Sequence, residues 1–190
     1  MLFTRSTASI FVLALLLSCT DHQLLKSTRA FKNQQITLSS DWNAIWKGRD
    51  TVLAGFTQVP VKLVVWYDSL GCASCQMSKM SDWTHITAYA DSLSPWFNII
   101  YLFTPKEQDV ERLHMTLRGS RLDYPVFIDQ HATFVKQNKL PRHPELHSFL
   151  LDKNNRVIMV GNPLYNSALW DFYKRTIQRM IANNGILPES

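Results

Sequence analysis

The sequence has few cysteines, no run of basic residues and no long hydrophobic segment. Its 190 residues include only 3 cysteines, an odd number that leaves one of them without an internal partner. The formal net charge is +5 at pH 7, yet the longest basic cluster is the pair Lys174-Arg175. Nucleic acid binding normally needs a concentrated basic patch. We therefore expect no nucleic acid partner.

The N-terminal apolar run, Ile10 to Leu17, has only eight residues, whereas a membrane-spanning helix needs about 20. With Arg5 before it and Ser18-Cys19 after it, the run is typical of an export signal. Leu16-Leu17-Ser18-Cys19 resembles the lipobox of bacterial lipoproteins, which implies a lipid on Cys19 and a membrane anchor. A plain secretory signal with an incidental Cys19 is the alternative.

The remaining chain is suited to one globular domain. Hydrophobic residues make up 46% and aromatic residues 12% of the sequence, enough for a sizeable core. The stretch after Cys19 is polar. We therefore expect a signal peptide over residues 1–18, a tether over 19–35 and one domain over 36–190.

Two continuous apolar runs predict buried strands at Val61 to Tyr67 and at Phe97 to Phe103. Apolar residues at helical spacing predict a helix from about Met77 to Leu93 and another over Glu107 to Gly119. Strand, helix, strand and helix in this order imply parallel pairing in one sheet.

Weaker patterns flank this unit. Ile36 to Leu38 is expected to form a short edge strand, and the spacing of Trp42, Ile45 and Trp46 indicates one helical turn. An Asp/Asn-rich turn between two apolar runs predicts an antiparallel hairpin over 147–151 and 157–160. A last helix is expected over 166–182.

The segment Cys72-Ala73-Ser74-Cys75 follows the first buried strand and precedes the first long helix. At a helix start, unpaired backbone N–H groups and the helix dipole stabilise a thiolate and lower its pKa. Two cysteines at this spacing can open and close a small disulfide. We therefore expect Cys72 to be the nucleophile of thiol exchange and Cys75 the resolving thiol.

This order of elements, with the segment Phe149-Leu150-Leu151-Asp152 in the hairpin, resembles the thioredoxin superfamily. Within it, the membrane-tethered TlpA and ResA type is the most similar subgroup, and the resemblance covers about residues 56 to 182. It implies an α/β, thioredoxin-like fold with a central mixed β-sheet flanked by α-helices. It also implies a thiol-disulfide oxidoreductase of the bacterial cell envelope, anchored by lipid on the periplasmic side. The expected partners are a protein disulfide or dithiol substrate and an upstream electron donor or acceptor, and no cofactor is expected.

The sequence departs from this family at three places. Gly71 precedes the first cysteine where the family usually has Trp, and Ala73-Ser74 stands between the two cysteines. Trp66 occupies the position of the family's buried acid, so Asp68 is the nearest candidate acid or base. Leu146 aligns with the family's cis-proline, which makes Pro144 the candidate for that role, with Pro125 and Pro141 as weaker ones.

Two other functions fit the same residues. His143 and His147 have the His-x3-His spacing that could complete a zinc or copper site with the cysteine pair. Against this site, the long separation between cysteines and histidines is unlike that of a zinc finger, and no metal site is assigned. Alternatively, the domain has lost catalysis and serves as a thioredoxin-like binding module, since folds outlast their chemistry.

Overall fold

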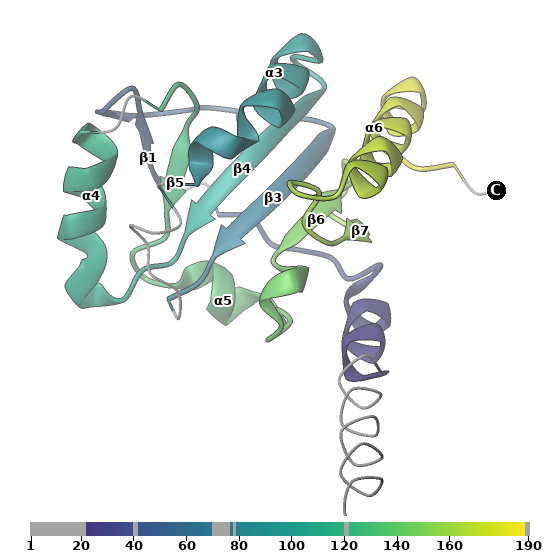
Figure 1. The fold of residues 1–190 in the computed structure, drawn as a ribbon, viewed down its shortest axis with the longest axis horizontal. Coiled ribbons are helices and arrows are strands. Elements are labelled where there is room, and N and C mark those ends of the chain that lie inside the picture. The colour runs from purple at the N-terminus through teal and green to yellow at the C-terminus, as the bar shows by residue number, and fades with distance from the viewer. Residues whose placement is uncertain (1–21, 40–41, 70–76, 78, 120–121, 189–190) are drawn as a thin grey trace, which may run out of the picture.

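The computed structural model describes residues 22–39, 42–69, 77, 79–119 and 122–188. They form one mixed seven-stranded sheet in the order β2-β1-β5-β4-β3-β6-β7 (Figure 1). The strands are β1 (Asn43–Trp46), β2 (Arg49–Thr51), β3 (Val61–Tyr67), β4 (Phe97–Phe103), β5 (Val126–Ile128), β6 (Ser148–Leu151) and β7 (Val157–Val160). The helices with described bounds are η1 (Met80–Trp83), α3 (Thr84–Ser92), η2 (Glu107–Asp109), α4 (Val110–Gly119), α5 (Thr133–Gln137), η3 (Pro144–Leu146) and α6 (Ser167–Ala182).

The two central strands are those that the apolar runs predict. β3 and β4 pair in parallel over their whole length, from Val61 opposite Phe97 to Tyr67 opposite Phe103. Nearly every side chain of both strands is buried. Strands covered on both faces need apolar residues at every position, which explains why the runs are continuous rather than alternating.

The sheet separates two cores. On one face, the residues at positions 61, 63 and 65 of β3 pack with α3, α4 and α6. On the other face, Val64 and Trp66 pack with Phe134 of α5, Phe149 of β6 and Phe31 from the N-terminal segment. Successive strand residues point to opposite faces, so each strand contributes to both cores. Figure 1 shows α3 on one side of β4 and α5 at the end toward which β3 and β4 run.

The C-terminal part of the prediction is also confirmed. β6 and β7 form the expected antiparallel hairpin, and β6 pairs antiparallel with β3. Asn166 precedes α6 and its side chain accepts a hydrogen bond from the backbone N–H of Leu169 at 2.9 Å. This N-cap begins the helix where the sequence pattern predicts it.

The expected helical turn at Trp42, Ile45 and Trp46 is wrong. Asn43–Trp46 is strand β1, which pairs antiparallel with both β2 and β5. β1, β2 and β5 have only three or four residues each, too few for a periodic pattern to distinguish strand from helix. The expected strand at Ile36 to Leu38 is reduced to a single bridge between Gln35 and Arg156.

The expected tether is partly structured. Residues 22–31 are helical, and Phe31 is buried with its ring 5.0 Å from that of Phe149. The backbone of Asn33 donates to Val157 O at 2.8 Å. The aromatic side chain of Phe31 therefore anchors this otherwise polar stretch to the core. Within the described ranges, no helix is long and apolar enough to span a membrane.

Candidate functional site at the end of strand β3

The cysteine segment connects the central strand to the helix layer. Cys72 and Cys75 lie outside the described residues, as does Cys19. On the N-terminal side, β3 ends at Tyr67, whose ring stacks on that of Phe103 at 4.5 Å. On the C-terminal side, η1 begins at Met80 and leads into α3. The sequence position of both cysteines therefore falls between the carboxyl end of β3 and the helix that covers the sheet.

Trp66 occupies the position at which the thioredoxin superfamily, which the sequence resembles, has a buried acid. Its indole N–H donates to Thr104 Oγ1 at 2.9 Å. The Thr104 hydroxyl in turn donates to Tyr67 O at 3.4 Å. Both side chains are buried. A neutral, hydrogen-bonded pair thus fills the space beneath the end of β3, and no titratable group stands at residue 66 itself.

The acid and base at this end of the sheet are Asp68 and His147, which come from two different strand ends. His147 Nδ1 lies 3.9 Å from Asp68 Oδ2, and the imidazole ring lies 4.1 Å from the Trp66 ring. The backbone N–H of Trp66 donates to His147 O at 2.9 Å. The β3–β6 pairing therefore brings together Asp68, Trp66 and His147, three residues that the sequence singles out for unrelated reasons.

The contacts of His147 determine its tautomer. Nε2 lies 3.1 Å from Pro141 O, and a carbonyl oxygen can only accept, so Nε2 carries the hydrogen. Nδ1 then faces Asp68 and is the atom that gains or loses a proton. Burial lowers the pKa of His147 below its ordinary value, while the hydrogen bond with Pro141 O and the charges of Asp68 and Glu145 offset part of that decrease.

Pro144 does not have the expected cis bond. Among the described residues, the cis peptide bond is Ser94–Pro95. Pro144 begins η3, and the N–H groups of Leu146 and His147 donate to His143 O and Pro144 O. The first position of a helical turn needs no N–H donor and suits a trans proline. Leu146, at the position aligned with the family's proline, is buried.

A cavity of about 660 Å³ opens beside these residues, and we call it the β3-end pocket. Its lining includes Trp66, Asp68, Ser69, Thr104, Val135 and His147. Ser69 is the last described residue before the cysteine segment. The pocket therefore lies next in sequence to the proposed redox residues.

The outer wall of this pocket is α5, which the sequence analysis missed. Asp129 is buried, and its carboxylate accepts hydrogen bonds from Thr133 N, Thr133 Oγ1 and Phe134 N at 2.8 to 3.0 Å. Asn138 closes the helix by bonding to the backbone of Thr37 and Phe134. The detectable signal was an Asp shortly before a Thr and an apolar residue, which is typical of a helix start.

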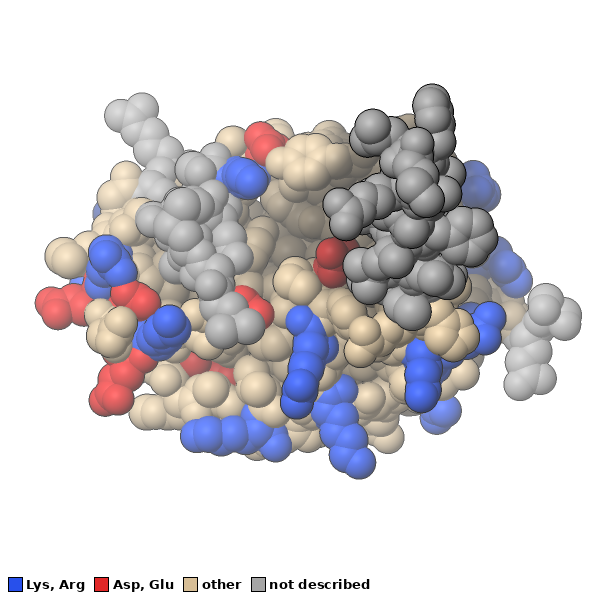
Figure 2. All heavy atoms as spheres, turned by 60° about the horizontal axis from the view of Figure 1, so that its bottom comes forward, with Lys and Arg blue, Asp and Glu red and all other residues tan. Residues whose placement is uncertain are grey.

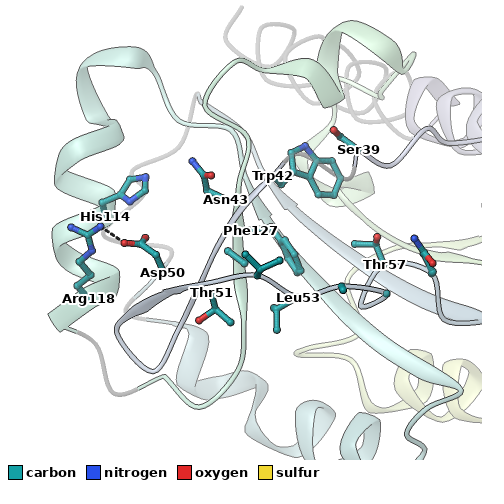
Figure 3. Close-up of a pocket in the computed structure, with 15 residues that line it drawn as sticks. Ser39, Trp42, Asn43, Asp50, Thr51, Leu53, Thr57, His114, Arg118 and Phe127 are labelled. Atoms are coloured by element: carbon teal, nitrogen blue, oxygen red, sulfur yellow. Dashed lines mark hydrogen bonds and ion pairs between the residues drawn. The ribbon is translucent and has the colours of Figure 1, made fainter.

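A second cavity, of about 700 Å³, lies beside β1 and β2 at one edge of the sheet. Figure 3 shows this edge pocket, which is lined by Trp42, Asn43, Asp50, His114, Arg118 and Phe127 among others. Arg118 Nη2 lies 2.5 Å from Asp50 Oδ2. The indole N–H of Trp42 is buried and has no partner among the described residues.

The zinc or copper alternative combines His143 and His147 with two cysteines that lie outside the described residues. Both ring nitrogens of His147 already face protein oxygens, of Pro141 and Asp68. In the described ranges, no group of three or more His, Cys, Asp and Glu side chains is placed to hold a metal ion.

Comparison with known proteins identifies the fold. No family model matches the sequence, and no curated protein matches it. Among solved structures, it is similar to the C-terminal domain of a protein named as a thiol-disulfide oxidoreductase from Bacteroides thetaiotaomicron, with 11% identity, a TM-score of 0.51, and 78% of this chain and 98% of that chain covered.

Two other solved structures are also similar to this chain. One is an uncharacterized thioredoxin-like protein from Porphyromonas gingivalis, with 12% identity, a TM-score of 0.47 and coverage of 84% of this chain and 99% of that one. The other is the exposed lipoprotein thioredoxin of Streptococcus pneumoniae, with 11% identity, a TM-score of 0.47 and coverage of 70% and 98%. With a mixed sheet flanked by helices and a Cys-x-x-Cys segment after its central strand, this chain has a thioredoxin-like α/β fold.

Proposed function

We propose that the protein is a thiol-disulfide oxidoreductase that acts on protein disulfides through Cys72 and Cys75. The observation that supports this proposal is the position of the Cys-x-x-Cys sequence, directly between the central strand β3 and the helices η1 and α3 of a thioredoxin-like sheet. The proposal includes the TlpA and ResA type, export to the cell envelope and a lipid anchor on Cys19.

Thiol exchange accounts for all bonds and electrons without a cofactor. The Cys72 thiolate attacks one sulfur of a substrate disulfide, and the other sulfur leaves as a thiolate that takes up a proton. Cys75 then loses its proton and attacks the Cys72 sulfur of the mixed disulfide. The second substrate sulfur leaves as a thiol, and the protein holds a Cys72–Cys75 disulfide. An upstream dithiol reduces this disulfide again, and the reverse sequence oxidises a substrate.

The deprotonation of Cys75 needs a base, and the described groups at the end of β3 suggest which one. Trp66 is neutral, so we assign the proton to Asp68 and His147 acting together. With Nε2 bonded to Pro141 O, His147 takes up a proton at Nδ1, the atom that faces Asp68. Asp68 stabilises the imidazolium formed.

The test uses the chain with Cys19→Ser, which leaves Cys72 and Cys75 as its two cysteines. The protein is equilibrated in glutathione buffers, and alkylation of each cysteine is followed against pH by mass spectrometry. We expect one intramolecular disulfide and alkylation of Cys72 at a pH well below the ordinary thiol range of about 8.5. An ordinary Cys72 thiol together with no Cys72–Cys75 disulfide would mean a binding module without catalysis.

The same assay distinguishes the metal alternative. Added zinc that protects both thiols from alkylation, with the protection abolished in His143→Ala, would replace redox chemistry by metal binding. Zinc without effect on alkylation supports the redox proposal.

A further inference from the structure

We propose that the β3-end pocket is a docking site for an acidic segment of the protein substrate, with an apolar side chain in the pocket and a carboxylate at its basic rim. The proposal deepens the proposed function, on which the identity of the partner as a substrate rests. The pocket itself consists of described residues.

The interior of the pocket is suited to an apolar side chain. Trp66, Leu140, Pro105 and Pro141 contribute to its lining, together with Val135, whose side chain is 41% exposed. Pockets that hold a ligand usually have volumes of about 300 to 1,000 Å³, and this one has about 660 Å³. One or two side chains of a docked segment therefore fit within it.

The rim of the pocket is basic. Lys106 comes from the loop after β4, and Lys139 and Arg142 from the segment after α5. All three side chains are exposed, and none of them forms an ion pair with another described residue. Figure 2 shows this end of the molecule, where basic side chains extend across the lower part of the face and acidic ones lie mostly toward the left.

The single carboxylate in the lining does not neutralise this rim. Asp68 is mostly buried and faces His147 rather than solvent, with 3.9 Å between Oδ2 and Nδ1. Three exposed cations and one mostly buried anion give the pocket an excess of positive charge. A partner with carboxylates is therefore favoured over a neutral or basic one, because complementary charge increases the rate of encounter and disfavours wrong partners.

The location of the pocket indicates which part of the substrate would bind there. Ser69 lines the pocket and is three residues before Cys72 in the sequence. A segment held at this pocket is close along the chain to the proposed nucleophile. The preferred substrate is therefore a protein in which acidic and apolar residues flank the reactive cysteine.

Binding is tested with full-length protein carrying Cys19→Ser and a fluorescein-labelled peptide of Asp, Glu and Leu residues without cysteine, by fluorescence anisotropy. The matched probe has Asn and Gln in place of Asp and Glu. The test variant combines Lys106→Glu, Lys139→Glu and Arg142→Glu. The control combines Lys26→Glu, Arg29→Glu and Lys32→Glu, which changes the net charge equally on exposed positions of the N-terminal segment.

We expect the acidic peptide to bind at least tenfold more tightly than the amide peptide at low salt, with the difference reduced as salt is added. The rim variant is expected to lose at least tenfold in affinity, and the control less than threefold.

The apolar interior is tested separately. Val135→Asp is expected to weaken binding, whereas Val52→Asp, at a position 94% exposed and outside this pocket, is not. Equal binding of the two peptides, or equal loss in the rim variant and the control, overturns the proposal. So does binding of octanoate without binding of either peptide, which would make the pocket a small-molecule site.

A separate assay keeps this proposal distinct from the proposed function. The rate of 2-hydroxyethyl disulfide reduction measures thiol exchange alone, because this small neutral substrate has no acidic segment to bind at the pocket. We expect this rate to be unchanged in the rim variant. If this reduction is absent while charge-dependent peptide binding persists, the oxidoreductase proposal fails and the docking site stands. If both are present, a disulfide placed in the acidic peptide is expected to show a tenfold higher KM in the rim variant with kcat unchanged.

Discussion

The β3-end pocket and the edge pocket have similar volumes but differ in how their polar groups are satisfied. In the β3-end pocket, Trp66 is hydrogen-bonded to Thr104 and buried beside His147, while the rim cations have no described carboxylate partner. In the edge pocket, Trp42 has an indole N–H without a described partner, while Arg118 is paired with Asp50. The first pocket has a hydrogen-bonded tryptophan inside and cations without a described partner at its opening. The second has a tryptophan N–H without a described partner inside and an ion pair in its lining.

The largest expected loss of stability is that of Trp66→Ala in the β3-end pocket. This variant should lower the free energy of unfolding by about 3 to 5 kcal/mol, because a large buried side chain is removed and the Thr104 hydroxyl loses its donor. Urea denaturation followed by circular dichroism measures this change.

Phenylalanine variants separate the hydrogen bond from the packing. Trp66→Phe should cost about 1 to 3 kcal/mol because a buried acceptor loses its partner, whereas Trp42→Phe removes an N–H that has none and should cost less. Equal losses in the two variants would show that the hydrogen bond of Trp66 contributes nothing beyond packing.

The hydrogen bonds from the first turn of α5 to Asp129 should give the next largest effect. Asp129→Asn replaces one carboxylate oxygen with an NH2 group, which cannot accept a hydrogen bond. A backbone donor such as Phe134 N then loses its acceptor, at a cost of about 2 kcal/mol. The measurement is the urea midpoint. The matched change in the edge pocket, Asp50→Asn, affects an exposed pair and should cost less than about 1 kcal/mol. A similar cost for both variants would contradict the view that the β3-end wall is the more tightly fixed.

The pH dependence of stability should reveal the burial of His147. Its folded pKa is below the ordinary value of 6.5, so the unfolded chain binds the proton first as pH falls below that value. The free energy of unfolding then decreases, by about 1.4 kcal/mol for each pKa unit of depression. We expect His147→Gln to lose less stability than the parent protein between about pH 7.5 and about pH 5. An identical pH profile in the variant would mean that another group dominates.

The smallest effect is expected for the ion pair of the edge pocket. Arg118→Gln should change the free energy of unfolding by no more than about 1 kcal/mol, because exposed ion pairs contribute little. It should leave peptide binding at the β3-end pocket unchanged, in contrast to the rim variant. Loss of peptide binding in Arg118→Gln would identify the edge pocket as the docking site instead.

The part of the sheet from β4 to β7 could be predicted from sequence, and the side formed by β2, β1 and β5 could not. β3 and β4 have the predicted bounds because both faces are buried, so the apolar run ends where the strand ends. β1, β2 and β5 are short, and their place in the sheet depends on pairing between distant segments. α5 is equally short and depends on the buried Asp129 rather than on periodicity.

The site shows the same division. Asp68 could be named from its distance to Cys72, and His147 from its spacing to His143, but their contact needs the register of β6 against β3. Val65 lies opposite Ser148 in that register, which places the next residues, Trp66 and His147, at the strand ends. The cis-proline expected at Pro144 failed because a short helical turn occupies residues 144–146.

The pairing of β6 with β3 has a consequence for how the site forms during folding. His147, Phe149 and Leu151 alternate with Ser148 and Leu150, so His147 shares a face with the core residues Phe149 and Leu151. A slip of one residue in the pairing of β6 with β3 would turn Phe149 away from Phe31. The residues of β6 that now pack in one core would then face the other. The register that buries Phe149 is therefore the same register that sets His147 beside Asp68. Formation of the correct core and the approach of His147 to Asp68 therefore depend on one and the same strand register.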